Sequence, residues 1–198
     1  MAESEVKGLA GYAAGNSEYN AMQFMIKQAI RGQVNTCVIC KVVAVDGDYV
    51  DVLPLVTEIS GLGEAVEPTT LFHLPFMRYH AGIAAVILNP VPGDLGLAVF
   101  STRDNSGVTK GTTTPKPPAS FRGNTMANGF YIGGFLNQTP STFIEITQGG
   151  QVNITAPSGV NISGNVTVSG DVVASGISLT GHVHGGVQSG GSTTSGPQ

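Results

Sequence analysis

The chain has 198 residues and a formal net charge of −4 at pH 7, from nine Lys and Arg and thirteen Asp and Glu. Proteins that bind nucleic acid through its phosphates need clustered cations, so this balance argues against nucleic acid as a partner. All nine cations and eleven of the thirteen acids precede residue 123. This shift in composition predicts at least two structural regions.

The N-terminal segment, residues 1–32, is predicted to contain one short helix over residues 17–31. Ser17 is a typical N-cap, Glu18 is an acid in the first turn, and Gly32 follows the last turn. Apolar residues recur at helical spacing and predict one apolar face. That face packs either on its own domain or on another protein, and the sequence favours neither. Its members are Met22, Met25, Ile26, Ala29 and Ile30.

Residues 33–105 are predicted to form a small β-barrel. A Val-rich run over residues 34–45 is followed by Asp46-Gly47 and a second run over residues 49–56. Asp-Gly between β-branched runs predicts a hairpin with a type I′ turn. Further strands are predicted, and about five strands in about 70 residues favour a Greek-key barrel of the OB type, with an SH3-like barrel as the alternative. These further strands cover residues 71–79, 83–88 and 95–101.

Four side chains in this region could bind a metal, and we interpret all four as structural. Cys37 and Cys40 form a C-x-x-C motif, but on a strand residues three apart point to opposite faces. We expect buried free thiols, not a zinc or redox site. His73 and His80 have no partner at a matching spacing, so we expect ordinary barrel histidines.

A Pro- and Gly-rich stretch, residues 106–139, is predicted to be a linker. Short alternations of apolar and polar residues then recur over residues 140–180, each bounded by glycine. Each repeat has only two apolar side chains and cannot bury them alone, so the pattern predicts either three intertwined chains or a single-chain solenoid. We favour a triple-stranded β-helix, because a solenoid with so few large side chains would be poorly filled.

Two histidines stand where this repeat ends, in the segment 181–198. His182 and His184 share a face if the strand continues. Two imidazoles do not make a closed metal site, but three copies around a three-fold axis supply six nitrogens. Such a set suits octahedral coordination of iron, or of a similar late divalent ion, with one ion per trimer. Glycines at 181, 185 and 186 allow the close backbone approach that a narrow tip requires.

Three stretches of the chain resemble one known family. They are VVAVDGDYVDVLPLV (42–56), NPVPGDLGLAVFSTRDNSG (89–107) and, most specifically, GHVHGGVQSGGSTTSGPQ (181–198). The sequence resembles the central spike, or baseplate puncturing, proteins of contractile-tailed bacteriophages. This resemblance implies an N-terminal OB-fold that joins the tail hub, a triple-stranded β-helix, and a needle apex where six histidines of a trimer hold a buried iron ion.

The expected function is therefore structural and mechanical. We expect a homotrimeric virion protein at the tip of the tail baseplate, bound to hub proteins and driven through the host bacterial outer membrane when the tail contracts. The alternative is a trimeric receptor-binding adhesin or tail fibre, but a C-terminus without aromatic residues argues against a broad recognition surface. No nucleophile motif, carboxylate pair with a supporting domain or nucleotide loop appears, and six nitrogens would leave no open metal position, so no enzyme is expected.

Overall fold

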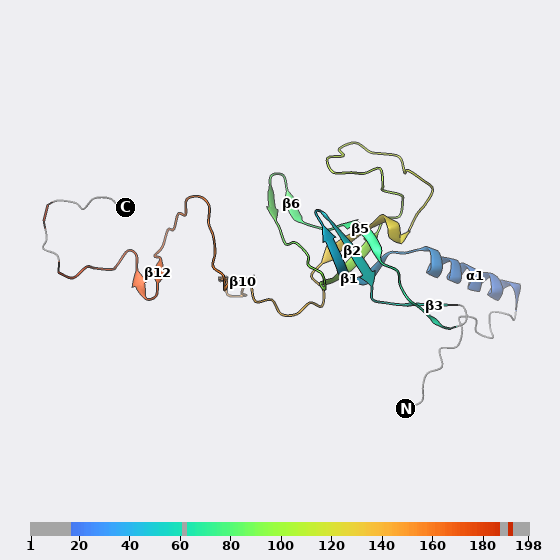
Figure 1. The fold of residues 1–198 in the computed structure, drawn as a ribbon, viewed down its shortest axis with the longest axis horizontal. Coiled ribbons are helices and arrows are strands. Elements are labelled where there is room, and N and C mark those ends of the chain that lie inside the picture. Colours follow the sequence, from blue (N-terminus) through green and yellow to red (C-terminus); the bar gives the residue numbers. More distant parts are fainter. Residues whose placement is uncertain (1–16, 61–62, 187–189, 192–198) are drawn as a thin grey trace, which may run out of the picture. The chain divides into compact units, whose positions relative to one another are not determined.

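The computed structural model describes residues 17–60, 63–186 and 190–191. The chain divides into two compact units, Met1–Thr139 and Pro140–Gln198, and each is taken by itself below. Figure 1 shows a mainly β protein with a single α-helix in its described part. Within the described ranges, no helix has both the length and the apolar character needed to cross a membrane.

The predicted N-terminal helix is confirmed as α1 (Glu18–Gln33). The Ser17 side chain caps it by accepting a hydrogen bond from the Asn20 N–H at 3.2 Å. The helix ends two residues later than predicted, where the Val34 N–H still donates to the Ile30 carbonyl. Its predicted apolar face exists and is exposed in the chain, with Tyr19, Met22, Met25, Ile26 and Ile30 as its large side chains.

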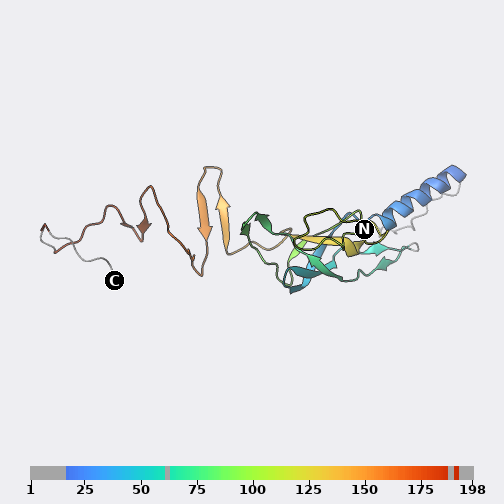
Figure 2. The same ribbon diagram turned by 90° about the horizontal axis from the view of Figure 1, so that it is seen from above.

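The centre of the first unit is a five-stranded antiparallel sheet in the order β5-β2-β1-β8-β9. A parallel bridge between Phe76 and Tyr131, with the Met77 N–H donating to the Tyr131 carbonyl at 2.8 Å, connects the segment after β5 to β9. The two outer strands are thereby brought together, and the sheet curls (Figures 1 and 2). The strands are β1 (Cys37–Asp46), β2 (Tyr49–Pro54), β5 (Leu71–Pro75), β8 (Leu95–Phe100) and β9 (Gly129–Gly133).

The hydrophobic core lies on the concave side of this curled sheet. Every second residue of β2 and β8 is buried, as expected for strands with one face on a core. Burial raises the pKa of Tyr131 to about 12, and its hydroxyl has no hydrogen-bond partner among the described residues. The buried apolar residues are Cys40, Val42, Val50, Val52, Leu74, Ala98, Phe100 and Tyr131.

Three short elements complete the first unit. Glu58–Ile59 (β3) pairs with Ala65–Val66 (β4), and Tyr79–Ala81 (β6) pairs with Ala84–Val86 (β7). The strand predicted over residues 71–79 is thus two strands, β5 and β6, which belong to different sheets. A 3-10 turn, Met126–Asn128, leads into β9.

Strand β9 was not predicted, because its residues lie in the segment 106–139 assigned to a linker. It is only five residues long, and glycines stand at both ends of its strand-forming Phe-Tyr-Ile core. Gly129 is tightly packed: a Cβ there would lie 3.0 Å from side-chain atoms of Leu74 and of Phe100, which would have to shift by a few tenths of an ångström. Gly129 interrupts the strand pattern in the sequence, and the same residue packs closely against the core.

The loop before β9 is also held together near the end of β8, through Asp104, which lies four residues after that strand. This buried carboxylate accepts hydrogen bonds from the Ser106 N–H and hydroxyl, from the Ser120 hydroxyl and from Arg122. The Ser120 hydroxyl contributes most to holding the pKa of Asp104 far below its usual range. Much of the predicted linker is consequently an anchored loop.

The β1–β2 hairpin is confirmed, but its turn lies one residue later than predicted. Asp46 pairs with Tyr49, which leaves Gly47 and Asp48 as the turn residues. Only Gly47 has a positive φ, of 58°. A type I′ turn needs positive φ at both central residues, so the predicted turn type was wrong.

The expectation of two buried thiols was half wrong. Cys40 is fully buried, its thiol donates to the Gly96 carbonyl at 3.7 Å, and burial raises its pKa to about 11. Cys37 is exposed. The two residues lie on opposite faces of β1, as predicted, and only one face of this strand meets the core.

The second unit contains two hairpins. Phe143–Ile146 (β10) pairs with Val152–Thr155 (β11), seen in Figure 2 as two adjacent orange arrows, and Val173–Ala174 (β12) pairs with Ile177–Ser178 (β13). The alternations at residues 160–163 and 166–169 are not strands in the single chain. A strand needs a neighbour to bond with, and within one chain these segments have none in the described residues.

No described residue of the second unit is buried. Fourteen of its large apolar side chains are exposed, and Ile146 and Ile162 are 76% and 66% accessible. The others are Phe143, Ile144, Val152, Ile154, Val160, Val166, Val168, Val172, Val173, Ile177, Leu179 and Val183. The described part of this unit therefore has no hydrophobic core of its own.

Gly96 of β8, which pairs with Gly133 of β9, gives the first stability prediction. A Cβ on Gly96 would lie 2.5 Å from Tyr131 Cε2 and 2.6 Å from the Ile132 carbonyl oxygen. Because the carbonyl cannot move without breaking the sheet, we expect Gly96→Ala to lower the free energy of unfolding of this unit by about 1–3 kcal/mol. Gly32→Ala is the control, since a Cβ there meets nothing within 4 Å and alanine favours helix. Equal denaturant midpoints for the two variants would contradict this packing.

Candidate metal centre

The hairpin β12–β13 leads directly into the two C-terminal histidines. Ala174 pairs with Ile177, so Ser175 and Gly176 form a two-residue turn, with φ values of 49° and 83°. Positive φ at both positions is the requirement of a type I′ turn, whose twist matches that of the flanking strands. The turn fixes where β13 begins, and β13 leads into the histidine segment.

A second turn, closed by hydrogen bonds to Ser178, follows β13. The Gly181 N–H donates to the Ser178 hydroxyl at 2.8 Å, and the His182 N–H donates to the Ser178 carbonyl at 3.2 Å. The Thr180 N–H donates to Asp171 Oδ1 at 3.1 Å. Asp171 lies on the other side of the hairpin, just before β12, and its pKa is lowered first of all by a hydrogen bond from the Ser178 hydroxyl.

His182 and His184 are brought together, although not by a continuing strand. Strand β13 ends at Ser178, so the prediction that alternate residues share a strand face does not apply here. The two rings nevertheless lie edge to face, with centroids 5.1 Å apart and planes at 79°. Both side chains are exposed.

The hydrogen bonds of His182 assign its tautomer. Its Nδ1 lies 2.8 Å from the Ser178 carbonyl oxygen and 3.1 Å from the Leu179 carbonyl oxygen. Carbonyl oxygens only accept hydrogen bonds, so Nδ1 must carry the proton. In the neutral ring the lone pair then lies on Nε2, the nitrogen directed away from the backbone and available to a metal.

One chain does not complete a metal site. Within residues 17–60, 63–186 and 190–191, no group of three or more His, Cys, Asp or Glu could hold an ion. Two adjacent imidazoles per chain fit a site shared between copies, which is the donor set the sequence predicts. Imidazole nitrogen suits iron, nickel, copper and zinc, so the donors alone do not select the metal.

The other two histidines belong to the first unit. His73 stacks on Tyr49 with ring centroids 3.8 Å apart, and its N–H donates to Asp51 Oδ1 at 2.8 Å. His80 lies in β6 and pairs with Ala85 across the small hairpin. The contacts of His73 fit a structural role, whereas His80 lies outside the five-stranded sheet, so the interpretation of both as barrel histidines stays a prediction.

Asp171 and Ser178 are the residues of this site that the sequence did not reveal. Ser178 belongs to the apolar–polar repeat, whose serines and threonines are too common to single out one of them. Asp171 could have been singled out in the sequence, because it is the last acid of the chain and follows 25 residues without a charge. The alternation pattern assigned it no role.

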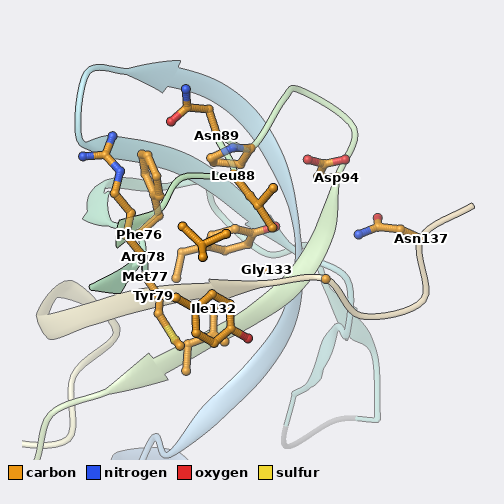
Figure 3. A pocket seen from close by; sticks show the side chains of 14 residues that line it. Phe76, Met77, Arg78, Tyr79, Leu88, Asn89, Asp94, Ile132, Gly133 and Asn137 are labelled. Carbon is orange, nitrogen blue, oxygen red and sulfur yellow. The ribbon is translucent and has the colours of Figure 1, made fainter. Parts of the chain in front are cut away.

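A pocket in the first unit is the other candidate site (Figure 3). It has a volume of about 270 Å³, and Arg78 lies 4.8 Å above the Phe76 ring at its wall. Two of its polar side chains are occupied: Asn137 bonds both the N–H and the carbonyl of Leu95, and Asp94 accepts from the Val91 N–H. Arg78 Nε and the Tyr131 hydroxyl are buried and have no hydrogen-bond partner among the described residues. The lining residues contain no pair of nucleophile and base, so this pocket supports no catalytic assignment.

Comparison with known families identifies the C-terminal segment. Residues 176–198 match the family model of the GpV apex motif, which is the tip motif of phage central spike proteins. The resemblance predicted from the sequence is confirmed by this match, which includes both histidines and strand β13. A search of curated proteins finds no match to the chain.

Proposed function

We propose that this protein is a homotrimeric central spike at the tip of a contractile phage tail, and that it pierces the bacterial outer membrane when the tail contracts. The observation that carries this proposal is an apex motif at residues 176–198, at the end of a unit in which no described residue is buried. A rigid shaft with a closed tip is what a mechanical piercing role requires.

The exposed apolar side chains of the second unit support association of three copies. Their apolar–polar alternation places them along one side of short extended segments, as in Val160-Asn-Ile162 and Val166-Thr-Val168. Three intertwined chains bury this side along a common axis and give every strand a neighbour. Unfolding would require separating all three chains together, which provides kinetic stability to a part under mechanical load.

The first unit supports attachment through an OB-type barrel. If β1, β2, β5, β8 and β9 are taken as strands one to five, their order is 3-2-1-4-5, and the third and fifth strands meet through the parallel Phe76–Tyr131 bridge. This is the order of a Greek-key OB barrel. Hub or baseplate proteins are the proposed partners of this unit, and the exposed apolar face of α1 is available to such a partner.

The metal has a structural role in this proposal. His182 and His184 from three copies would hold one ion, iron or a similar late divalent metal, at the apex. The ion supplies cross-links between the three chain ends and so prevents fraying of the tip. Because every ligand comes from protein, we propose no turnover at this site and no enzymatic activity.

The alternative, a trimeric adhesin or tail fibre, uses a similar shaft. An adhesin needs a recognition surface, and such surfaces are enriched in Tyr, Trp and Phe. No aromatic residue follows Phe143 in this chain. The apex motif, which belongs to spike proteins, also favours the spike over the fibre.

The location of the protein on the particle tests this proposal. Gold-labelled antibodies against the first unit should mark the tip of the tail, and a variant lacking residues 140–198 should still be incorporated but yield particles of strongly reduced infectivity. The expected incorporation follows from placing attachment in the first unit, which holds most of the charges. Label along side fibres would support the adhesin instead, and loss of incorporation would place attachment in the shaft.

A further inference from the structure

We infer that Asp171 and Ser178 act as positioning residues for His182, by fixing both the place of its ring and the nitrogen that it offers to a metal. This inference rests on the proposed metal-capped apex. It assigns a role to residues that are not themselves among the proposed ligands.

The first step is the link from Asp171 to the turn. The carboxylate lies before β12, yet it accepts the Thr180 N–H, beyond β13, at 3.1 Å. A hydrogen bond from the hydroxyl of Ser178, the last residue of β13, contributes most to lowering the pKa of Asp171. The lowered pKa of Asp171 keeps the carboxylate ionised at neutral pH. No Lys or Arg follows Arg122 in the sequence, so these donors, and not a cation, stabilise its charge.

The second step is the link from Ser178 to the histidine. The Ser178 carbonyl accepts from both the backbone N–H and the Nδ1 of His182, while its hydroxyl accepts from the Gly181 N–H. One residue therefore fixes the backbone before His182 and the orientation of its ring. Asp171 in turn fixes Ser178, because its carboxylate accepts a hydrogen bond from the Ser178 hydroxyl.

The third step is the consequence for coordination. The hydrogen bond at Nδ1 leaves Nε2 of His182 as the nitrogen with a free lone pair. Hydrogen-bond partners of this kind hold the tautomer and the ring orientation of metal-ligating histidines, and their loss costs about 10- to 100-fold in metal affinity. A shared site multiplies the effect, because each copy in a trimer would carry the same network.

The test uses the full chain and two measurements. Four variants are compared with wild type: Asp171→Ala, Asp171→Asn, Ser178→Ala and the control Glu145→Ala. Glu145 is the other acid of the second unit, and it accepts a hydrogen bond from Asn153 across β10–β11. Cobalt(II) is the probe, and its affinity is measured by competition with a chelator. Nitrogen-15 NMR of the metal-free protein reports the tautomer of His182, assigned with His182→Ala.

We expect Asp171→Ala to bind cobalt about 10- to 100-fold more weakly and to lose the pure Nδ1–H tautomer of His182. Asp171→Asn retains an oxygen that accepts the Thr180 N–H, so it should recover most of the affinity and of the tautomer. Ser178→Ala keeps the carbonyl that Nδ1 contacts and loses only the hydroxyl, so its tautomer should change less than that of Asp171→Ala. Glu145→Ala should behave as wild type in both measurements.

Two outcomes would overturn the inference: an unchanged His182 tautomer in Asp171→Ala, or equal loss of affinity in Asp171→Ala and Glu145→Ala. The second would indicate a general loosening of the unit. If wild type takes up no cobalt, the proposed metal centre fails, while the tautomer comparison still decides whether Asp171 positions His182. The two failures are thus distinguishable.

Discussion

The full chain should sediment as a trimer, and a variant lacking residues 140–198 should sediment as a monomer. The fourteen apolar side chains of the second unit stay exposed within the described residues of one chain, even where Ile144 faces Ile154 and Ile146 faces Val152 across β10–β11. Burying each of them fully is worth about 1.5–3 kcal/mol, so even partial burial between copies gives a large driving force for association. The first unit has its own core and should stay folded without the shaft. Analytical ultracentrifugation of both proteins measures the result.

A pair of neighbouring substitutions makes this prediction specific to the apolar side of the shaft. Ile162→Asn places a polar amide where the proposal buries an isoleucine, and it should lower the melting temperature of the trimer and speed its dissociation. Asn161→Ser changes the adjacent residue, which points the other way in an extended segment, and it should have little effect. A wild-type chain that remains monomeric at high concentration, or equal effects of the two substitutions, would rule out this mode of assembly.

The spacing of apolar residues predicted which local helices and strands exist better than it predicted where they begin and end. Helix α1 and strands β1, β2 and β8 follow from capping, spacing and alternation, which are properties of a few neighbouring residues. Strand β9 was missed in this way, because its Gly129 packs against Leu74 and Phe100, which are far away in the sequence. Its pairing with β8 is equally non-local.

The residues of the candidate site also divide into those that the sequence predicted and those that it did not. His182 and His184 were recognisable because an H-x-H pair at the end of a repeat is unusual in both chemistry and position. The supporting residues were not, because the role of Asp171 depends on a hairpin that folds it back onto Thr180, nine residues later. Whether Cys37 is buried also depended on which faces of β1 are covered, and alternation shows only that the two cysteines differ.

Metal content should follow the two apex histidines together. We expect one ion per three chains in wild type, because one chain offers two adjacent imidazoles and no group of three ligands in its described residues. His182→Ala or His184→Ala would leave one imidazole per chain, and three ligands do not close an octahedral site, so tight binding should be lost. Elemental analysis of the dialysed protein, with sedimentation of the same sample, gives the ratio of metal to trimer.

The same substitutions should separate the tip from the shaft. The shaft depends on many apolar side chains spread over residues 143–183, whereas the metal would fix only the chain ends. His182→Ala should therefore remain trimeric while residues near the C-terminus become accessible to protease. His80→Ala, an exposed histidine in β6, is the matched control and should keep the full metal content. Three ions per trimer, or full occupancy in His182→Ala, would place the metal on ligands of a single chain and refute the shared apex.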